Sequence, residues 1–430
     1  MRTTRLCSFS LILFAGWNVA EGSTGSESHP ESDEQVSKKI AALRTEIDEY
    51  RSTVAEEPLD AVRRDQVRNL IVDVLDATRS RVSFADEPWN QITSADGRFT
   101  LEANAFIQYD WLLNSTPGEH TQYGMDLNVT WLTLSGTIFD PAWSYGICTS
   151  IPSDGVLGLQ FAYVQYQFED GFFIQAGALS EVFSLEQAVS LTEQLGASLS
   201  YAAGQFDAGT PEGLQVGKQL DDHRFWLTFS NGWGQQFINP LENQRMGVMG
   251  RFEFKPFGDW DSLYNFNPYP ESTTEGLLLG IGGAYDWGDY DVNGPSAISG
   301  DATRATVDLS WQKAGLGLMV TGYYQDVPDG GSAGGRRWAG VGQGAFFLTP
   351  NWDIYVRGEW GTILDREQQD IVMATIGTSW FPAGNSQVKV TAEFIQSWGS
   401  TVDWLVDGDL GVLQVDEPQS IIRTQVQLAF

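Results

Sequence analysis

The sequence is poor in cysteine, histidine and basic residues. Its 430 residues include 2 Cys, 3 His and 25 Lys and Arg against 56 Asp and Glu, for a formal net charge of -31. Cys7 lies in a predicted leader, which leaves Cys148 alone and excludes a disulfide scaffold. Phosphate backbones would repel so acidic a surface, so we expect no nucleic-acid partner.

A long hydrophobic run is also missing. After the leader, no stretch approaches the roughly 20 consecutive apolar residues of a membrane helix. Aromatic residues nevertheless make up 13% of the chain, glycine occurs 46 times, and charged residues at 19% are too few for a disordered acidic protein. This composition predicts a folded chain and leaves two classes open, a large soluble β-sandwich and a transmembrane β-barrel.

Patterns typical of enzymes are absent from the sequence. A Ser/His/acid site would need His29, His120 or His223, which lie in a predicted flexible segment, a loop tip and a turn. Walker loops and glycine-rich dinucleotide loops are missing as well. We therefore expect a protein that is not an enzyme.

The first 88 residues are predicted to form three segments that precede the main domain. Residues 1–22 are typical of a signal peptide, since two arginines precede a short apolar run and small residues follow it. Residues 23–33 are rich in Ser, Glu and Gly and predict a flexible linker. Residues 34–88 predict a helical, coiled-coil-like segment in the periplasm.

The coiled-coil prediction depends on the spacing of apolar side chains. From Val36 to Val54 they are separated alternately by four and three residues, and a second helical pattern follows Pro58. Two interpretations remain open. Residues 34–82 are either an oligomerising stalk or cell-wall contact, or an amphipathic linker without a specific role.

From residue 89 onwards, apolar and polar residues alternate with a period of two, the pattern of strands with one apolar and one polar face. We count about sixteen such segments, near residues 98–111, 122–138, 142–151, 157–169, 171–179, 213–220, 222–231, 245–256, 275–287, 303–313, 315–326, 336–348, 351–361, 370–382, 386–398 and 419–430.

Tight turns and longer connections alternate between these segments, as an outer-membrane barrel requires. One exception, residues 257–274, falls where a short turn is expected and predicts either an enlarged turn or an error in the register. Sixteen strands exceed what one sandwich normally holds. We therefore predict an all-β fold: a 16-stranded antiparallel transmembrane β-barrel over 89–430, in contact with outer-membrane lipid.

The last strand supports this prediction. Residues 422–430 alternate apolar and polar side chains and stop on Phe430. This ending resembles the C-terminal strand by which outer-membrane proteins are recognised by their assembly machinery.

Several stretches resemble the phosphate-selective porin (porin O and P) family. Asp96–Gln108 is similar to its opening strand and Leu134–Gly136 to the end of its second. Phe161–Tyr166, Gly171–Gly177 and Phe183–Glu186 resemble two strands that lead into an inward loop. The resemblance implies a homotrimer of sixteen-stranded barrels, each with a constriction loop at roughly 180–212.

The chain departs from this family in the charge of that loop. The family's anion selectivity comes from Arg and Lys along the pore, but no Lys or Arg occurs from Asp170 to Gly217. The predicted constriction residues are instead acidic: Glu181, Glu186, Glu193, Asp207 and Glu212.

Strand parity predicts charged side chains of both signs on the lumen wall, where they either set ion preference or pair with one another as wall residues that fill the lumen. The predicted basic residues are Arg224, Arg251, Lys255, Arg304, Arg357, Lys389 and Arg423. The predicted acidic residues are Glu102, Asp110, Glu253, Asp308, Asp353, Glu359 and Glu393.

One loop contains a weak candidate for calcium binding. Asp289, Asp291 and Asn293 match the opening of an EF-hand-type loop, but its twelfth position is Gly300 where a bidentate Glu is needed. We expect no other cofactor.

Together these patterns predict an outer-membrane porin that passes small hydrophilic solutes or ions passively, with cation preference or weak selectivity. Two alternatives remain open. The first is a phosphate- or anion-selective porin, as in the resembled family. The second is a structural barrel that tethers the envelope through the N-terminal helical segment.

Overall fold

A computed structural model gives the structure of the chain. It describes Thr45 and residues 90–430, apart from 95, 152–156, 181, 208, 233–244, 289–299, 328–334, 365–369 and 405–409. Apart from Thr45, the signal peptide, the linker and the helical segment predicted for 1–88 lie outside the described residues.

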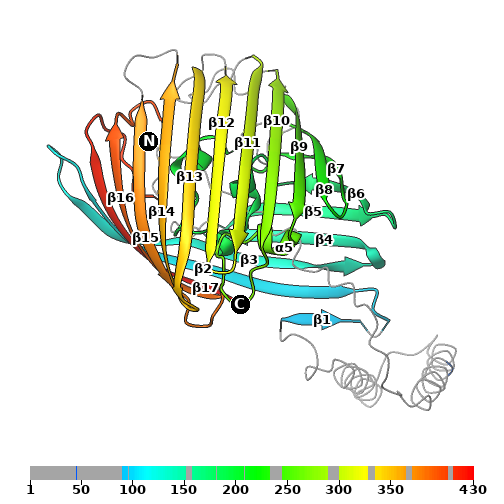
Figure 1. Ribbon diagram of the computed structural model, residues 1–430. Coiled ribbons are helices and arrows are strands. Elements are labelled where there is room, and N and C mark those ends of the chain that lie inside the picture. Colours follow the sequence, from blue (N-terminus) through cyan, green and yellow to red (C-terminus); the bar gives the residue numbers. More distant parts are fainter. Residues whose placement is uncertain are drawn as a thin grey trace, which may run out of the picture. The chain divides into compact units, whose positions relative to one another are not determined.

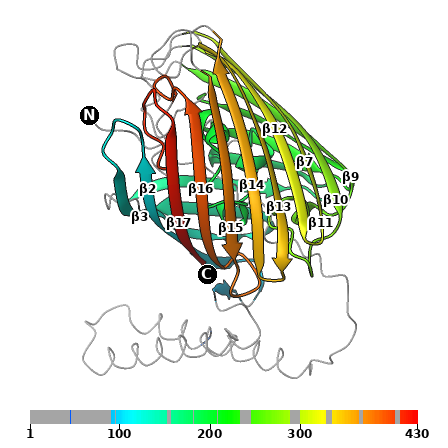
Figure 2. The ribbon, with the colours of Figure 1, turned by 60° about the vertical axis from the view of Figure 1, so that its left-hand side comes forward.

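Sixteen antiparallel strands, β2 to β17, close into a barrel (Figure 1). Each strand pairs with the next, and β17 pairs with β2 to complete the ring, so the predicted sixteen-stranded fold is confirmed (Figure 2). The first eight barrel strands are β2 (Thr100–Ser115), β3 (Gln122–Ile138), β4 (Asp140–Ser150), β5 (Gly158–Gln167), β6 (Phe172–Ala178), β7 (Glu212–Gln219), β8 (His223–Ser230) and β9 (Met246–Phe257).

The second eight are β10 (Gly276–Trp287), β11 (Ala302–Lys313), β12 (Leu316–Val327), β13 (Gly335–Thr349), β14 (Trp352–Ile363), β15 (Ile371–Trp380), β16 (Val388–Gly399) and β17 (Gln419–Ala429). A short additional strand, β1 (Gln91–Thr93), pairs with the start of β2.

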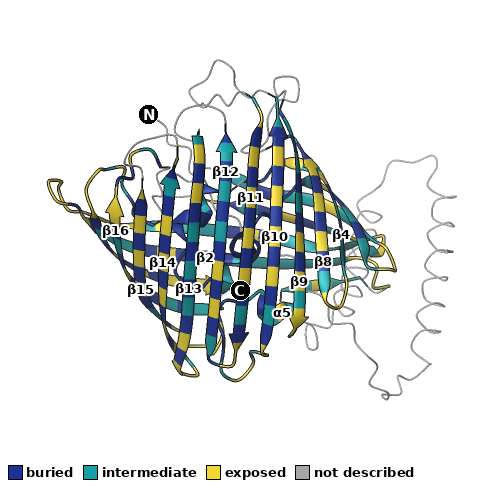
Figure 3. Cartoon of the chain, turned by 45° about the horizontal axis from the view of Figure 1, so that its top comes forward, coloured by how far each residue is buried: buried dark blue, intermediate teal, exposed yellow. Residues whose placement is uncertain are grey.

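Buried and exposed residues alternate along the strands (Figure 3). Most charged side chains in the middle of the strands are among the buried ones. On β14, Asp353 and Arg357 are buried, whereas Val356 is 58% exposed. A soluble protein would show the opposite arrangement. Apolar side chains outside and polar ones inside are what a barrel surrounded by lipid requires.

The connections alternate in length around the barrel. At one rim the turns are tight, as in the two residues between β11 and β12, where Gly315 adopts a φ of 78°. The exception at this rim is the connection between β9 and β10, residues 258–275, which we call the long turn. It contains helix α5 (Trp260–Leu263). Of the two alternatives, the structure therefore favours an enlarged turn.

The connection between β6 and β7, residues 179–211, contains three short helices: α3 (Leu185–Ala188), the 3-10 helix η1 (Leu191–Glu193) and α4 (Tyr201–Gln205). We call it the inserted loop, because its side chains and backbone contact inward-facing residues of the barrel. In the described part of the chain, no helix is long and apolar enough to cross a membrane.

Candidate functional site in the barrel lumen

Each helix of the inserted loop begins at a serine. Ser184 accepts a hydrogen bond from the Gln187 amide, and the Gln187 side chain accepts one from the Ser184 amide, which forms a capping box. Ser190 and Ser200 cap η1 and α4 with their hydroxyls, which accept the amides of Thr192 and Ala203. These caps satisfy amides that water cannot reach once the loop is buried, so the loop holds a defined shape.

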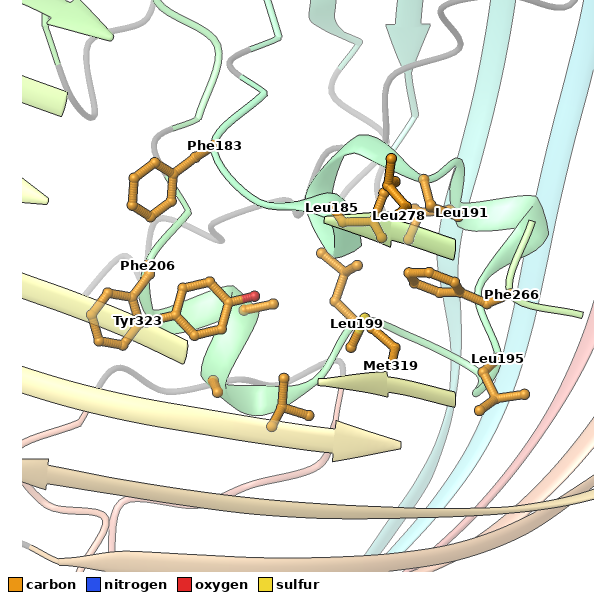
Figure 4. Close-up of a cluster of buried hydrophobic side chains, with 14 of the residues drawn as sticks. Phe183, Leu185, Leu191, Leu195, Leu199, Phe206, Phe266, Leu278, Met319 and Tyr323 are labelled. Carbon is orange, nitrogen blue, oxygen red and sulfur yellow. The ribbon is translucent and has the colours of Figure 1, made fainter. Parts of the chain in front are cut away.

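Apolar side chains of the inserted loop form a core inside the barrel (Figure 4). Phe206 stacks on Tyr323 of β12 with ring centroids 5.1 Å apart. The same cluster of buried residues includes Phe106 and Trp131, on β2 and β3. The core therefore joins the loop to strands of both halves of the chain. Loop residues in it are Phe183, Leu185, Val189, Leu191, Leu195, Leu199, Ala202, Ala203 and Phe206.

Carboxylates on the barrel wall bind backbone amides of the inserted loop. The amide of Ala202 donates to Glu359 Oε2 at 2.8 Å, and that of Leu185 donates to Asp308 Oδ2 at 3.3 Å. Glu393 Oε1 accepts from a third loop amide, that of Ala197, at 3.0 Å. These acidic residues were predicted to line the lumen, and the structure places them against the loop.

Basic residues on the wall bind backbone carbonyls of the same loop. The Lys389 ammonium donates to the carbonyls of Gln194, Leu195 and Gly196 at 2.5, 3.1 and 3.1 Å. Arg251 donates to Phe183 O at 3.1 Å, and Arg357 donates to Ser198 O at 3.2 Å. The wall thus complements the backbone of a loop segment that itself carries no Lys or Arg.

The wall charges also pair with one another. Glu253 binds both Arg224 (2.6 Å) and Arg251 (2.7 Å), and Arg251 also binds Asp308 (2.8 Å). Elsewhere Arg423 binds Glu393 at 2.6 Å, and Arg304 lies 3.4 Å from Asp286. All these side chains are buried. A charge removed from water needs such partners, because an unpaired one would cost several kcal/mol.

The predicted acidic residues of the inserted loop have separate environments. Glu186 is fully buried and accepts from the amide (2.7 Å) and hydroxyl (2.8 Å) of Ser200. Asp207 is buried and accepts from the Gly209 amide at 3.0 Å. Both groups therefore help to fold the loop itself. Glu181 lies outside the described residues.

Glu193 accepts a hydrogen bond from the Ser386 hydroxyl, which lies beyond the end of β15. Burial of the carboxyl raises the pKa of Glu193, while this hydrogen bond and the charge of Lys389 oppose the increase. Glu193 as a whole residue is less buried than Glu186 and Asp207, although its carboxyl Oε2 is shielded from solvent.

The placement of Glu212 in the constriction loop was wrong. Glu212 is the first residue of β7 and is exposed. It has the same parity as Leu214, which is 47% exposed, so its side chain points away from the lumen. The prediction failed because the boundary between loop and strand was set one residue too late.

The four remaining predicted wall residues each have a local partner. Lys255 donates to Gly258 O in the long turn at 2.8 Å. Glu102 accepts from Asn104 at 2.7 Å, Asp110 from Asn128 at 3.0 Å, and Asp353 from the Ser379 amide at 2.7 Å.

Sequence reasoning missed three buried charges and the role of the long turn. Arg245, Asp286 and Arg337 are buried, and strand parity could have identified Asp286 and Arg337. The long turn is rich in aromatic residues, which is unusual for a connection exposed to water and could have indicated that it packs inside the barrel.

Metal binding has no support in the described ranges, which contain no group of three or more His, Cys, Asp or Glu arranged to hold an ion. The calcium candidate, Asp289, Asp291 and Asn293, lies outside those ranges.

No protein-family model and no curated protein sequence matches this chain. Solved structures do match it. The anion-selective porin from Comamonas acidovorans has a TM-score of 0.54 at 11% identity, over 77% of this chain and 100% of that one. OmpT of Vibrio cholerae has a TM-score of 0.52 at 13% identity, over 79% and 99%. The outer membrane channel DcaP of Acinetobacter baumannii has a TM-score of 0.51 at 10% identity, over 79% and 99%. These likenesses show that the chain shares its barrel fold with outer-membrane porins and channels.

Proposed function

We propose that the protein is an outer-membrane porin through which small hydrophilic solutes or ions diffuse passively. The observation that carries this proposal is the inserted loop, residues 179–211, held by wall charges inside a closed sixteen-stranded barrel. A segment fixed in this way narrows the lumen and limits what can pass, which is how pore-lining groups select solutes.

The outer surface supports a location in the outer membrane. Large apolar side chains such as Ile376 (60% exposed) and Val307 (61% exposed) face outward from the strands. Contact of these side chains with lipid tails has no free-energy cost, whereas their exposure to water is unfavourable. We further propose a homotrimer with the N-terminal segment in the periplasm; one structure of Vibrio cholerae OmpT is described as a trimer form.

Weak cation preference is the selectivity that the lumen favours. The charged side chains of the inserted loop are all acidic, and wall cations such as Lys389 and Arg423 bind loop carbonyls or carboxylates. The alternative is anion or phosphate selectivity, as in the family that the sequence resembles. The Comamonas acidovorans porin, which shares the barrel fold, is described as anion-selective.

Reconstitution in planar bilayers tests the proposal. We expect discrete conductance steps and, in a KCl gradient, a reversal potential that indicates weak preference for K⁺. Absence of conductance steps from folded protein would refute the porin function. A strong preference for chloride or phosphate would leave the channel in place and refute the proposed selectivity.

A further inference from the structure

The long turn, residues 258–275, touches parts of the barrel that are far apart around the ring. Asp259 accepts from the Ser262 amide at 2.8 Å and so begins helix α5. The turn contacts β8, β9, the inserted loop, the turn between β11 and β12, and aromatic residues from β13 and the segment after β15. Figure 1 shows α5 at the rim that carries the tight turns.

Its first anchor is an aromatic clamp around a wall arginine. The Arg224 guanidinium lies 4.2 Å from the ring centroid of Trp260 and 3.8 Å from that of Tyr264. The Tyr264 hydroxyl donates to Glu253, with oxygens at 2.6 and 2.7 Å, and Trp260 Nε1 donates to Leu220 O at 3.2 Å. Burial raises the pKa of Tyr264, so its hydroxyl keeps the proton that it donates.

Its second anchor is the inserted loop. The amide of Phe266 donates to Glu193 O at 3.0 Å, and Asn267 Nδ2 donates to the same carbonyl at 3.1 Å. Phe266 is buried in the apolar core that contains Leu195 and Met319. The long turn therefore supports the inserted loop at Glu193.

Its third anchor lies further around the rim. The Gly315 amide donates to Pro268 O at 2.8 Å. Tyr269 packs against both Phe347 and Phe381, with centroid separations of 5.3 and 5.2 Å, and those two rings stack on each other. These contacts join the long turn to the far strands of the second half of the barrel, so it bridges strands that are not neighbours.

We propose that the long turn is a second constriction element, which holds the inserted loop in position and thereby sets the width of the passage. This inference rests on the proposed porin function. Phe266 and Asn267 position the loop directly, and Tyr264 holds the long turn against the wall. They act on solutes through the loop, so their loss changes conductance and the size limit together.

The main test is a comparison of two variants with a control. The double variant Phe266→Ala with Asn267→Ala removes the apolar contact and one hydrogen bond to Glu193, and Tyr264→Phe removes only the hydroxyl. We expect single-channel conductance to rise about twofold or more in the double variant, with a smaller increase for Tyr264→Phe. Glu271→Gln, at an exposed residue of the same turn, should match wild type.

Heat-modifiable migration on gels identifies folded barrels in each preparation. Conductance and size limit equal to wild type in both folded variants would overturn the inference while leaving the porin function intact. If the double variant does not fold, the increase expected for Tyr264→Phe decides the question.

A cross-link tests the arrangement without measuring transport. In a Cys148→Ser background, Glu193→Cys with Asn267→Cys should form a disulfide on oxidation of the folded protein, detectable as a shift on non-reducing gels, and neither single variant should form one. If folded protein does not form this disulfide, the inference is wrong. This measurement does not depend on whether the wild-type protein conducts ions, so it separates failure of the inference from failure of the porin function.

Discussion

Glu393 of β16 joins the barrel wall to the inserted loop by accepting the amide of Ala197 at 3.0 Å. The same carboxylate binds Arg423 at 2.6 Å and accepts the Tyr355 hydroxyl. One buried group therefore satisfies a wall cation, a wall hydroxyl and a loop amide. This carboxylate holds the inserted loop against the wall, and we expect its loss to affect both stability and conductance.

The variant Glu393→Gln should lose much of this arrangement. Arg423 would lose the carboxylate of Glu393 and keep the charge of Asp110, and breaking a buried ion pair costs up to about 3–5 kcal/mol. We expect the free energy of unfolding, measured by urea titration in lipid vesicles, to fall by that order, and channel noise to increase as the loop loosens. Glu119→Gln removes an exposed acid and serves as the control. A loss no larger than that of the control would contradict this assignment.

Gly196 of the inserted loop lies where a side chain would meet the wall. A Cβ at this position would be 2.5 Å from Glu393 Oε1 and 3.2 Å from Arg357 Nη2. We expect Gly196→Ala to destabilise the protein by about 1–3 kcal/mol, as overpacking usually does, and to change conductance. Its matched control is Gly358→Ala, where no atom lies within 4 Å of the new methyl group.

A double variant sharpens this test. Gly196 and Glu393 share one contact, so the loss of stability in the variant that combines Gly196→Ala with Glu393→Gln should be smaller than the sum of the two single losses. If the two losses of stability are additive, the packing of the loop at Gly196 does not depend on Glu393.

Most of the fold could be predicted because the strands of a barrel in lipid have one apolar and one polar face. Apolar and polar residues therefore alternate in the sequence with a period of two. Segment 122–138, for example, was predicted with the bounds that β3 has in the structure. Local signals set these bounds, since turn residues such as Gly315 end the alternation.

The site was harder to predict because it depends on contacts distant in sequence. Parity can place Lys389 on the inner face, but it cannot show that the ammonium binds carbonyls of the loop some 195 residues earlier. The sequence indicated an enlarged turn here but not its role, since its anchors on Glu253, Glu193 and Phe381 exist only in the closed barrel.

Deletion of residues 34–82 separates the N-terminal segment from the barrel. The ring closes through the pairing of β17 with β2, so the conductance of each barrel should be unchanged. If the segment is a stalk or a wall contact, fewer trimers or less attachment to cell-wall material should be recovered. If trimers and cell-wall attachment are unchanged, the segment is a linker without a specific role and the tethering function is refuted.

The selectivity of the channel should depend on pH through Glu193. Burial raises the pKa of this carboxyl above its ordinary value of 4.5. A raised pKa means that the group takes up its proton at a higher pH than an exposed glutamate would. As pH falls from 7, cation preference should therefore begin to decline before exposed carboxylates titrate.

Reversal potentials in a KCl gradient between pH 7 and pH 4 measure this decline. Glu193→Gln is neutral throughout, so it should show lower cation preference at pH 7 and a flatter pH dependence. Glu119→Gln controls for loss of one exposed charge. A Glu193→Gln channel with the wild-type pH profile would show that this carboxyl does not face the conducting path, and would transfer the selectivity to the wall residues.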